Sequence, residues 1–319
     1  MKIAYLYDHP TWSERLIDCF HNNGIDLQLI NVDELTFNTG SLDMDFRMLV
    51  NRVNVMPYEK RDPAIAFHTM HFLNWLELSG VRVVNGARTH YIGASKAMQN
   101  GIFSILGLDA PQAIAIYKTE DTLKAAEKIG FPVIVKPNIG GSGSNIARFN
   151  SSSELALAIE QKLIDFGVDG SGLVQEYIHS DGYVYRVEIL GEELFYSIKQ
   201  KIVESKFNYC AAEGCSTDTN NTGQREGFDF CAVEQSHQIQ LHDVSQNILQ
   251  QVISIIKKTG ADIGGIEYFI NRETGKPCYY DFNPYSNFVS QGEALLGFSP
   301  EQRFVNYIKS LYQVTSNEI

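Results

Sequence analysis

The segment 265–284 constrains the fold more than any other part of the chain, because it is typical of two β-strands joined by a tight turn. The turn is expected at residues 273–275, where a final glycine provides the positive φ that a three-residue hairpin loop requires. In that register Glu267 lies opposite Asp281. Side chains alternate along a strand, so Asn283 shares the face of Asp281.

These three side chains predict a metal site. Two facing carboxylates repel each other unless a positive charge lies between them. With the amide oxygen of Asn283 the set contains only oxygen donors, which suits Mg²⁺, or Mn²⁺ as the alternative, with phosphates completing the coordination. A solvated polar face is the competing interpretation. It is disfavoured because the flanking residues are those of a buried strand pair: Ile266, Phe269, Tyr279 and Phe282.

Composition excludes several classes of protein. The 319 residues allow two domains or three small ones, and the apolar share of 44% and charged share of 20% are those of an ordinary soluble globular protein. The net charge of −12, without a block rich in Lys and Arg, argues against a nucleic-acid partner. Five scattered cysteines without a CxxC pair indicate a reducing compartment. With no signal-peptide pattern and no membrane-length apolar run, we expect a cytoplasmic protein without a membrane partner.

Apolar runs and helical patterns alternate over roughly the first ninety residues, which predicts a small parallel α/β unit. Its expected strands are 3–7, 27–32, 48–53 and 81–84, and its expected helices are 12–22 and 64–79. Further helices are expected over 94–106, 153–166, 237–259 and 300–312, and further strands over 114–117, 133–136, 146–149, 173–178, 183–190 and 193–201. The polar segment 209–230 predicts a long functional or mobile loop.

Lys136 ends an apolar strand and precedes a loop rich in glycine and serine, residues 137–145. A lysine in a buried strand is costly unless it meets an anion, and the glycines let backbone N–H groups approach phosphate oxygens. Because the lysine precedes the glycines, the loop is not a Walker A motif. A flexible surface turn beside a lysine that reaches solvent is the alternative.

The strand 173–178 is a candidate hinge between domains. Backbone groups at its end would read the edge of an adenine while Ile178 packs on the face of the base. An ordinary strand end is the alternative.

Cationic side chains lie on the two following strands. Arg186 is either a solvated edge residue or a group that points into a site and neutralises an oxyanion or carboxylate. Of Lys199, Lys201 and Lys206, one is expected to reach a γ-phosphate, and the others are surface charges.

The order of these features resembles the ATP-grasp family over the chain from about Tyr91 to its end: a strand lysine, a Gly/Ser loop, a hinge strand, a strand arginine and a hairpin of oxygen ligands. Segment 95–111 resembles the lysine-led helix and proline exit of the branch that contains ribosomal-protein S6 glutamate ligases and glutathione synthetases. The resemblance implies an α/β fold, α+β in its C-terminal part, with an N-terminal pre-ATP-grasp domain. The implied domains are 1–92, 93–174 with the flap, and 175–319 with the metal site.

The same resemblance implies roles for individual residues. Lys96 and Lys136 would contact ATP phosphates, and Arg186 and Lys199 would be catalytic. The flap would be Gly140, Gly141, Ser142, Gly143 and Ser144, the adenine would lie against Gln175, Glu176, Tyr177 and Ile178, and Mg²⁺ would be held by Glu267, Asp281 and Asn283. Asp281 departs from the family, where Glu is more frequent, and so does Tyr285, where Arg often follows Asn-Pro.

The implied activity is that of an ATP-dependent carboxylate–amine ligase, which works through an acyl phosphate on small amino acids or peptides and releases ADP and phosphate. Homodimers are common among similar enzymes. Candidate substrate contacts are Asp8, His9, Trp12, Arg52 and the segment 209–230. Two alternatives are open: an ATP-grasp kinase of a polyol such as an inositol phosphate, which would need a basic pocket, and a non-catalytic nucleotide-binding protein.

Overall fold

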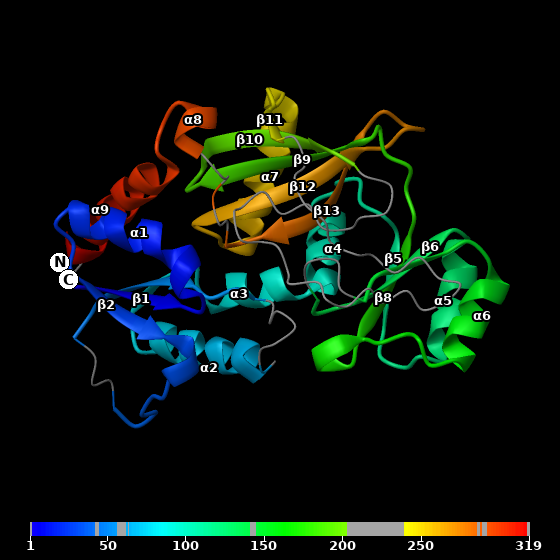
Figure 1. The fold of residues 1–319 in the computed structure, drawn as a ribbon, viewed down its shortest axis with the longest axis horizontal. Coiled ribbons are helices and arrows are strands. Elements are labelled where there is room, and N and C mark those ends of the chain that lie inside the picture. The colour runs from blue at the N-terminus through cyan, green and yellow to red at the C-terminus, as the bar shows by residue number, and fades with distance from the viewer. Residues whose placement is uncertain are drawn as a thin grey trace.

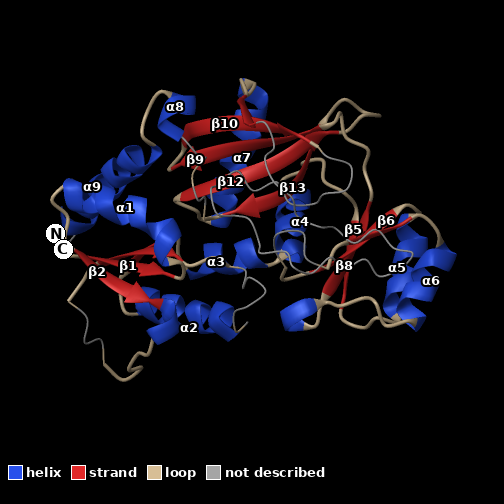
Figure 2. Ribbon diagram, viewed as in Figure 1, coloured by secondary structure: helices blue, strands red, loops and turns tan. Residues whose placement is uncertain are grey.

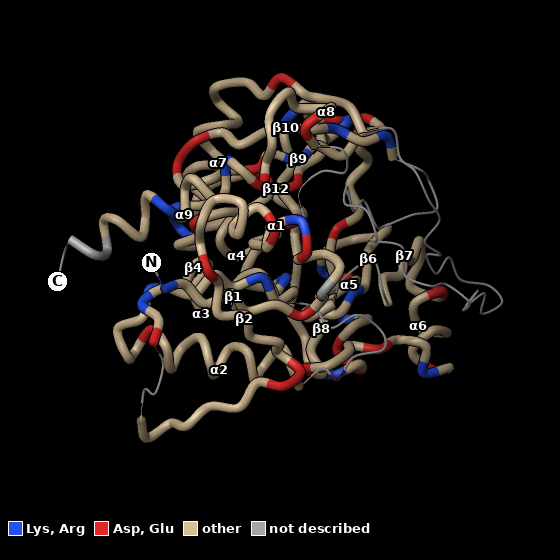
Figure 3. The backbone as a smooth tube through the Cα atoms, turned by 60° about the vertical axis from the view of Figure 1, so that its left-hand side comes forward, with Lys and Arg blue, Asp and Glu red and all other residues tan. Residues whose placement is uncertain are grey.

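A computed structural model describes residues 2–41, 45–55, 62, 64–140, 145–202, 239–285, 288 and 292–317. Within these residues the strands form three sheets, which follow one another along the chain. The first and second sheets along the chain lie at opposite ends of the view in Figure 1. The third and largest sheet lies between them. Acidic and basic positions are interspersed along the described chain (Figure 3).

The N-terminal sheet has the order β2-β1-β3-β4, and all of its strands are parallel, as predicted. Its buried strands are Val-, Ile- and Leu-rich, which suits a parallel sheet covered on both faces. The elements are β1 (Ile3–Tyr7), α1 (Pro10–Asn22), β2 (Leu27–Asn31), the 3₁₀ turn η1 (Val32–Glu34), β3 (Met48–Arg52), α2 (Ala64–Leu78), β4 (Arg82–Val84) and α3 (Ala87–Ala94).

The second sheet is antiparallel, in the order β5-β8-β6-β7, and α5 and α6 pack against it (Figure 2). Its elements are β5 (Ala113–Ile116), α5 (Asp121–Ile129), β6 (Val133–Pro137), β7 (Ala147–Phe149), α6 (Ser152–Glu160), η2 (Gly167–Asp169) and β8 (Gly172–Glu176). The helix α4 (Lys96–Ile105) precedes them in the chain but packs into the core of the third sheet. The domain boundaries stay predictions, but the one between 174 and 175 falls inside β8, whose pairing continues to Glu176.

The third sheet is antiparallel, in the order β11-β10-β9-β12-β13, and α7 covers one of its faces. Its elements are β9 (Tyr183–Leu190), β10 (Glu193–Lys201), β11 (Ile239–Leu241), α7 (Gln246–Thr259), β12 (Ile263–Ile270), β13 (Pro277–Asn283), α8 (Gly292–Leu296) and α9 (Pro300–Asn317). No helix among the described residues is long and apolar enough to cross a membrane.

Two predicted helices were wrong at their beginnings. The helix expected over 237–259 begins only at Gln246, after Ser245 caps it, and Ile239–Leu241 instead pairs with β10. The helix expected over 94–106 begins at Lys96, because Ser95 is extended and its hydroxyl accepts from the backbone N of Met98, and Ala94 instead ends α3.

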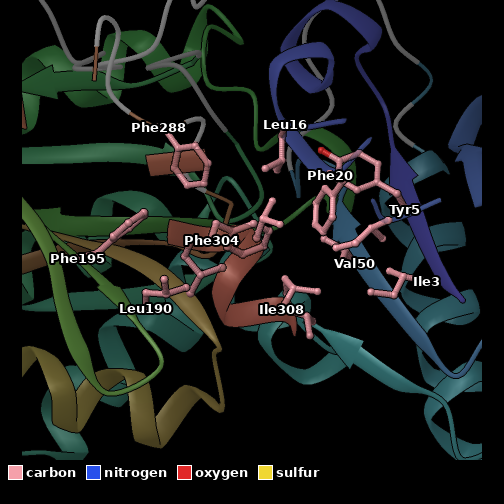
Figure 4. Close-up of a cluster of buried hydrophobic side chains, with 14 of the residues drawn as sticks. Ile3, Tyr5, Leu16, Phe20, Val50, Leu190, Phe195, Phe288, Phe304 and Ile308 are labelled. Atoms are coloured by element: carbon pink, nitrogen blue, oxygen red, sulfur yellow. The ribbon is translucent and has the colours of Figure 1, made fainter. Parts of the chain in front are cut away.

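One apolar core joins the first and last parts of the chain. Phe20 of α1 meets Phe304 of α9 edge to face, with ring centroids 6.4 Å apart, and Phe304 also lies beside Phe288 (Figure 4). The same core contains Leu190 and Phe195 from the largest sheet. The N-terminal sheet is therefore packed against the largest sheet through α9 rather than standing alone.

Away from α9, Asn85 forms a second connection between the N-terminal sheet and the largest sheet. Its side-chain Nδ2 donates to the carbonyls of Ile263 and Pro284, and its Oδ1 accepts from the backbone N of Asp262 and Ile263. Asn85 is buried, so these bonds replace water and hold the ends of β12 and β13 against β4.

Candidate functional site

The predicted hairpin register is present, although its turn differs. The backbone N of Asn271 donates to Lys276, so the turn encloses four residues, 272–275, rather than three. A bulge on β13 then adds one residue, because Glu267 pairs with Asp281 whereas Tyr268 pairs with Tyr279. The bulge restores the expected facing pair of carboxylates. Gly275 has the expected positive φ of 69°.

Side-chain alternation and the strand register place six residues on one face of the largest sheet, which we call the site face. It contains Arg186 and Glu188 of β9, Gly265 and Glu267 of β12, and Asp281 and Asn283 of β13. The opposite face packs against α7.

Arg186 lies on a central strand, so its interpretation as a solvated edge residue was wrong. Its Nε donates to Glu188 Oε1 at 2.6 Å, and its Nη1 donates to Glu267 Oε1 at 3.2 Å. All three side chains are buried. The two glutamates raise the pKa of Arg186 against the opposing effect of burial, so the guanidinium stays charged.

Two lysines approach the same carboxylates, one from α4 and one from the second sheet. Lys96, the first residue of α4, forms an ion pair with Asp281. Lys136 of β6 is buried, and burial together with the charge of Lys96 lowers its pKa to about 8, although Asp281 opposes the shift. Asn138 joins the two elements, because its Oδ1 accepts from Ser95 Oγ at 2.9 Å and from the backbone N of Ala97 at 3.0 Å.

The two facing carboxylates respond differently to this environment. Burial raises the pKa of Glu267, and Asp281 adds to the increase against the charge of Arg186. Burial also acts to raise the pKa of Asp281, but the charge and hydrogen bond of Lys96 hold it below its usual value. Asp281 is therefore the more acidic member of the pair.

The donor set is compatible with a divalent cation. Glu267, Asp281 and Asn283 present oxygens from two paired strands on one face, which is the chemistry that Mg²⁺ prefers. Asn283 Oδ1 accepts from the backbone N of Tyr285 at 2.9 Å, which fixes the amide and leaves a lone pair. Among the described residues, no group of three or more His, Cys, Asp or Glu side chains is arranged to hold a metal, so the amide is needed.

The hinge residues lie at the end of β8 between β5 and β6. Gln175 is buried. The backbone N of Glu176 donates to the carbonyl of Gln112, and that of Tyr177 donates to the carbonyl of Pro132. Within the described chain, Ile178 is thus the first hinge residue whose N–H donates to no neighbouring strand. The Arg148 guanidinium lies over the Tyr177 ring at 3.9 Å. Their role at an adenine stays a prediction.

The structure does not bring Lys199 to the site face. Lys199 pairs with Tyr185, which pairs with Tyr268 on the face that α7 covers. The cause is a bulge between Leu194 and Tyr196 in β10, which shifts the register by one residue and so reverses the face of every residue that follows. We therefore leave Lys199 out of the site.

Other predicted residues are placed as follows. Gly140 follows β6, whereas Gly141, Ser142, Gly143, Ser144, Lys206 and the segment 209–230 lie outside the described residues. Asp8 and Arg52 come at or just after the carboxyl ends of β1 and β3, and His9 stacks on Trp12 with centroids 4.3 Å apart.

Sequence reasoning missed Glu188 and Gly265 on the site face and a buried network at its edge. The Tyr285 hydroxyl accepts from Asn51 Nδ2 at 2.6 Å and lies 3.0 Å from Nδ1 of His90. Burial lowers the pKa of His90 to about 3, so its ring is neutral. Glu188 had a signal in the sequence, because it follows Arg186 by two residues in an alternating strand.

Comparisons with known proteins agree with this fold. Residues 102–180 match the model of the family described as carbamoyl-phosphate synthase L chain, ATP binding domain. The fold is similar to that of a RimK domain ATP-grasp protein from Sphaerobacter thermophilus, with a TM-score of 0.66, 15% identity and coverage of 96% of this chain and 99% of the other. It is also similar to the D-alanine–D-alanine ligase of Bacillus anthracis, with a TM-score of 0.68, 16% identity and coverage of 100% of each chain.

The sequence relatives match this chain over only part of their length. The chain is 28% identical over 201 residues to a formate-dependent phosphoribosylglycinamide formyltransferase of Bacteroides fragilis, which spans 62% of this chain and 47% of that protein. It is 26% identical over 198 residues to the glutamate–LysW ligase ArgX of Sulfurisphaera tokodaii, which spans 61% of this chain and 66% of that protein. The matches thus span about half to two thirds of these relatives. The chain has the α/β fold of the ATP-grasp superfamily, and the family match and the sequence relatives support the same superfamily.

The lowered pKa of Lys136 predicts a pH-dependent affinity for ATP. A phosphate favours the charged lysine, so binding should be strongest below pH 8 and should weaken as the pH rises through 8, by up to about tenfold per pH unit. Calorimetric titration of MgATP between pH 7 and 9.5 measures this. Lys136→Met should bind more weakly and show a flat profile over that range. An equally flat profile in the unmodified protein would contradict the prediction.

Proposed function

We propose that the protein is an ATP-dependent carboxylate–amine ligase. The observation that carries the proposal is a row of charged side chains across the site face and α4, in which a cation flanks each of two facing carboxylates: Lys96, Asp281, Glu267 and Arg186. Three cations and two facing carboxylates meet where the second and third sheets approach each other. Such a set suits a nucleotide whose phosphates are neutralised by side chains and by a divalent ion.

The residues have separate tasks in this proposal. Lys96 and Lys136 neutralise phosphate oxygens of ATP, and Arg186 contacts the oxygens that gain charge during transfer. Glu267, Asp281 and Asn283 hold Mg²⁺, which would draw charge from the phosphates and hold them in place. Lys96 is now bound to Asp281, so a phosphate and a metal would have to exchange partners with this ion pair.

The chemistry needs two displacements at the same place. An oxygen of the substrate carboxylate attacks the γ-phosphorus, the bond to the β,γ-bridging oxygen breaks, and ADP leaves with that electron pair. A neutral amine then attacks the carbonyl carbon of the acyl phosphate. Inorganic phosphate leaves, and the nitrogen loses a proton to solvent. Lys96, Lys136 and Arg186 lower the barrier of the first step by holding the transferred group in line.

Two of the similar proteins, the glutamate–LysW ligase and the D-alanine–D-alanine ligase, support amino-acid or peptide substrates. We accordingly place the carboxylate and the amine substrates among amino acids and peptides. Asp8 and Arg52 lie near the carboxyl ends of parallel strands, where α/β sheets commonly bind ligands, and are the substrate contacts we propose.

Product mass decides between the possible activities. The protein is incubated with MgATP and pools of amino acids, peptides and polyols, while ADP, phosphate and new masses are recorded. A mass equal to a carboxylate plus an amine minus water is the expected result. A phosphate-sized gain on a polyol would instead identify a kinase. ATP binding without turnover of any pool would exclude a ligase of these substrate classes and favour a nucleotide-binding protein.

A further inference from the structure

Glu188 is a charged residue whose position is not explained by stability. It lies in the middle of β9 with 0% exposure, between β10 and β12. Only its Oε1 has a partner, Arg186 Nε, and its Oε2 contacts no donor in the described part of the chain. Buried ion pairs can often be replaced by apolar side chains without loss of stability, and an unpaired buried oxygen is a cost. A functional reason is therefore expected for this carboxylate.

Gly265 makes room for Glu188 and Arg186 together. It is the direct partner of Glu188 on β12. A Cβ atom at Gly265 would lie 2.6 Å from Glu188 Oε1 and 2.8 Å from Arg186 Nε. These separations are shorter than van der Waals contact, so the carboxylate and the guanidinium lie directly against the backbone of β12.

Arg186 is held at two nitrogens by two different carboxylates. Glu188 accepts from Nε, and Glu267 accepts from Nη1. The second oxygen of Glu267 accepts from the Tyr280 hydroxyl at 2.6 Å, so Glu267 is itself held in place. A guanidinium has five N–H donors, and these two bonds leave three of them for a ligand.

We propose that Glu188 is a positioning residue that keeps Arg186 from pairing with Glu267 through both of its terminal nitrogens. This inference rests on the proposed function, in which Arg186 contacts phosphoryl oxygens and Glu267 contacts the metal. Without Glu188, Glu267 would be the only carboxylate among the described residues that is bonded to Arg186, and a two-bond pair with it is the preferred geometry. That pair would withdraw donors from the phosphate and a ligand from the metal at once.

Two substitutions separate charge from shape. Glu188→Gln keeps an oxygen that accepts from Arg186 Nε but removes the charge, and Glu188→Leu removes both while filling the volume. We expect a kcat lower by about tenfold in the first and about a hundredfold in the second. Glu193→Gln is the control, because Glu193 is exposed on β10 and faces Arg303 only at 3.7 Å.

A measurement on Arg186 itself keeps the inference independent of turnover. The ¹⁵N-detected solvent exchange of the Arg186 Nε–H, assigned by its loss in Arg186→Lys, should be slow in the unmodified protein and at least tenfold faster in Glu188→Leu. The affinity for MgADP, measured by calorimetry, should be lower in Glu188→Gln than in the unmodified protein and lower still in Glu188→Leu. Fast exchange in the unmodified protein, or unchanged kcat and MgADP affinity in a folded Glu188→Gln protein, would overturn the role of Glu188. Slow exchange and weakened MgADP binding without any ligase activity would support Glu188 and count against the proposed function alone.

Discussion

Replacing Asp281 with Asn should lower kcat/KM by about a thousandfold, because a metal ligand loses its charge in a site where the ion supplies several kcal/mol. Asp281 is also the partner of Lys96, and that lysine holds its pKa below the usual value. The amide would release Lys96 and would no longer oppose Glu267 electrostatically. The pKa of Glu267, which Asp281 helps to raise, should therefore fall in the variant.

Steady-state ADP release with the substrate pair identified in the pooled assay measures this effect. Glu273→Gln is the matched control, because Glu273 is an exposed acid in the turn of the same hairpin and should retain full activity. Urea unfolding at neutral pH should show Asp281→Asn to be less stable than the unmodified protein, because the ion pair with Lys96, which holds the pKa of Asp281 below its usual value, is lost. Activity within tenfold of the unmodified protein would remove Asp281 from the metal site.

Replacing Gly265 with Ala should reduce activity by about a hundredfold, comparable to the loss of one transition-state donor. The new methyl group would meet Glu188 Oε1 at 2.6 Å and Arg186 Nε and Nη2 at 2.8 and 2.9 Å. The guanidinium must then move away from β12. A destabilisation of about 1–3 kcal/mol should accompany the change, as for other overpacked cores.

The comparison that isolates this effect is Gly101→Ala. Gly101 lies inside α4, and a Cβ atom there would have no neighbour within 4 Å. Alanine is the better helix former, so this variant should gain about 0.5–1 kcal/mol and keep its activity. Chemical unfolding and turnover are measured for both variants. If Gly265→Ala behaved as Gly101→Ala does, the close approach of Arg186 to β12 would have no functional role.

Most of the correct predictions came from sequence patterns that extend over only a few residues. The hairpin was predictable because a glycine-containing turn and side-chain alternation act over a few residues, and the facing pair Glu267 and Asp281 followed from them. The parallel N-terminal sheet followed from alternating apolar runs and helices. The predicted turn length was nevertheless wrong, and the bulge at Tyr280 compensated for it.

The errors came from interactions that no short window contains. The bulge after Leu194 moved Lys199 to the other face, and bulges depend on the neighbouring strand rather than on the strand's own residues. Ile239–Leu241 continued a helical pattern but was captured by the free edge of β10. The pairing of Lys96 with Asp281 joins residues far apart in sequence, so only the fold could reveal it.

The position of α9 has a consequence for how the protein is made. Phe304 and Ile308 complete the core that holds Ile3, Tyr5 and Phe20, and the backbone N of Lys2 donates to the Tyr312 hydroxyl. The ribosome must therefore finish α9 before the first strands to be synthesised can close their core. Until then the aromatic side chains of the N-terminal sheet and α1 have no partner from α9, which makes them natural targets for chaperones during synthesis.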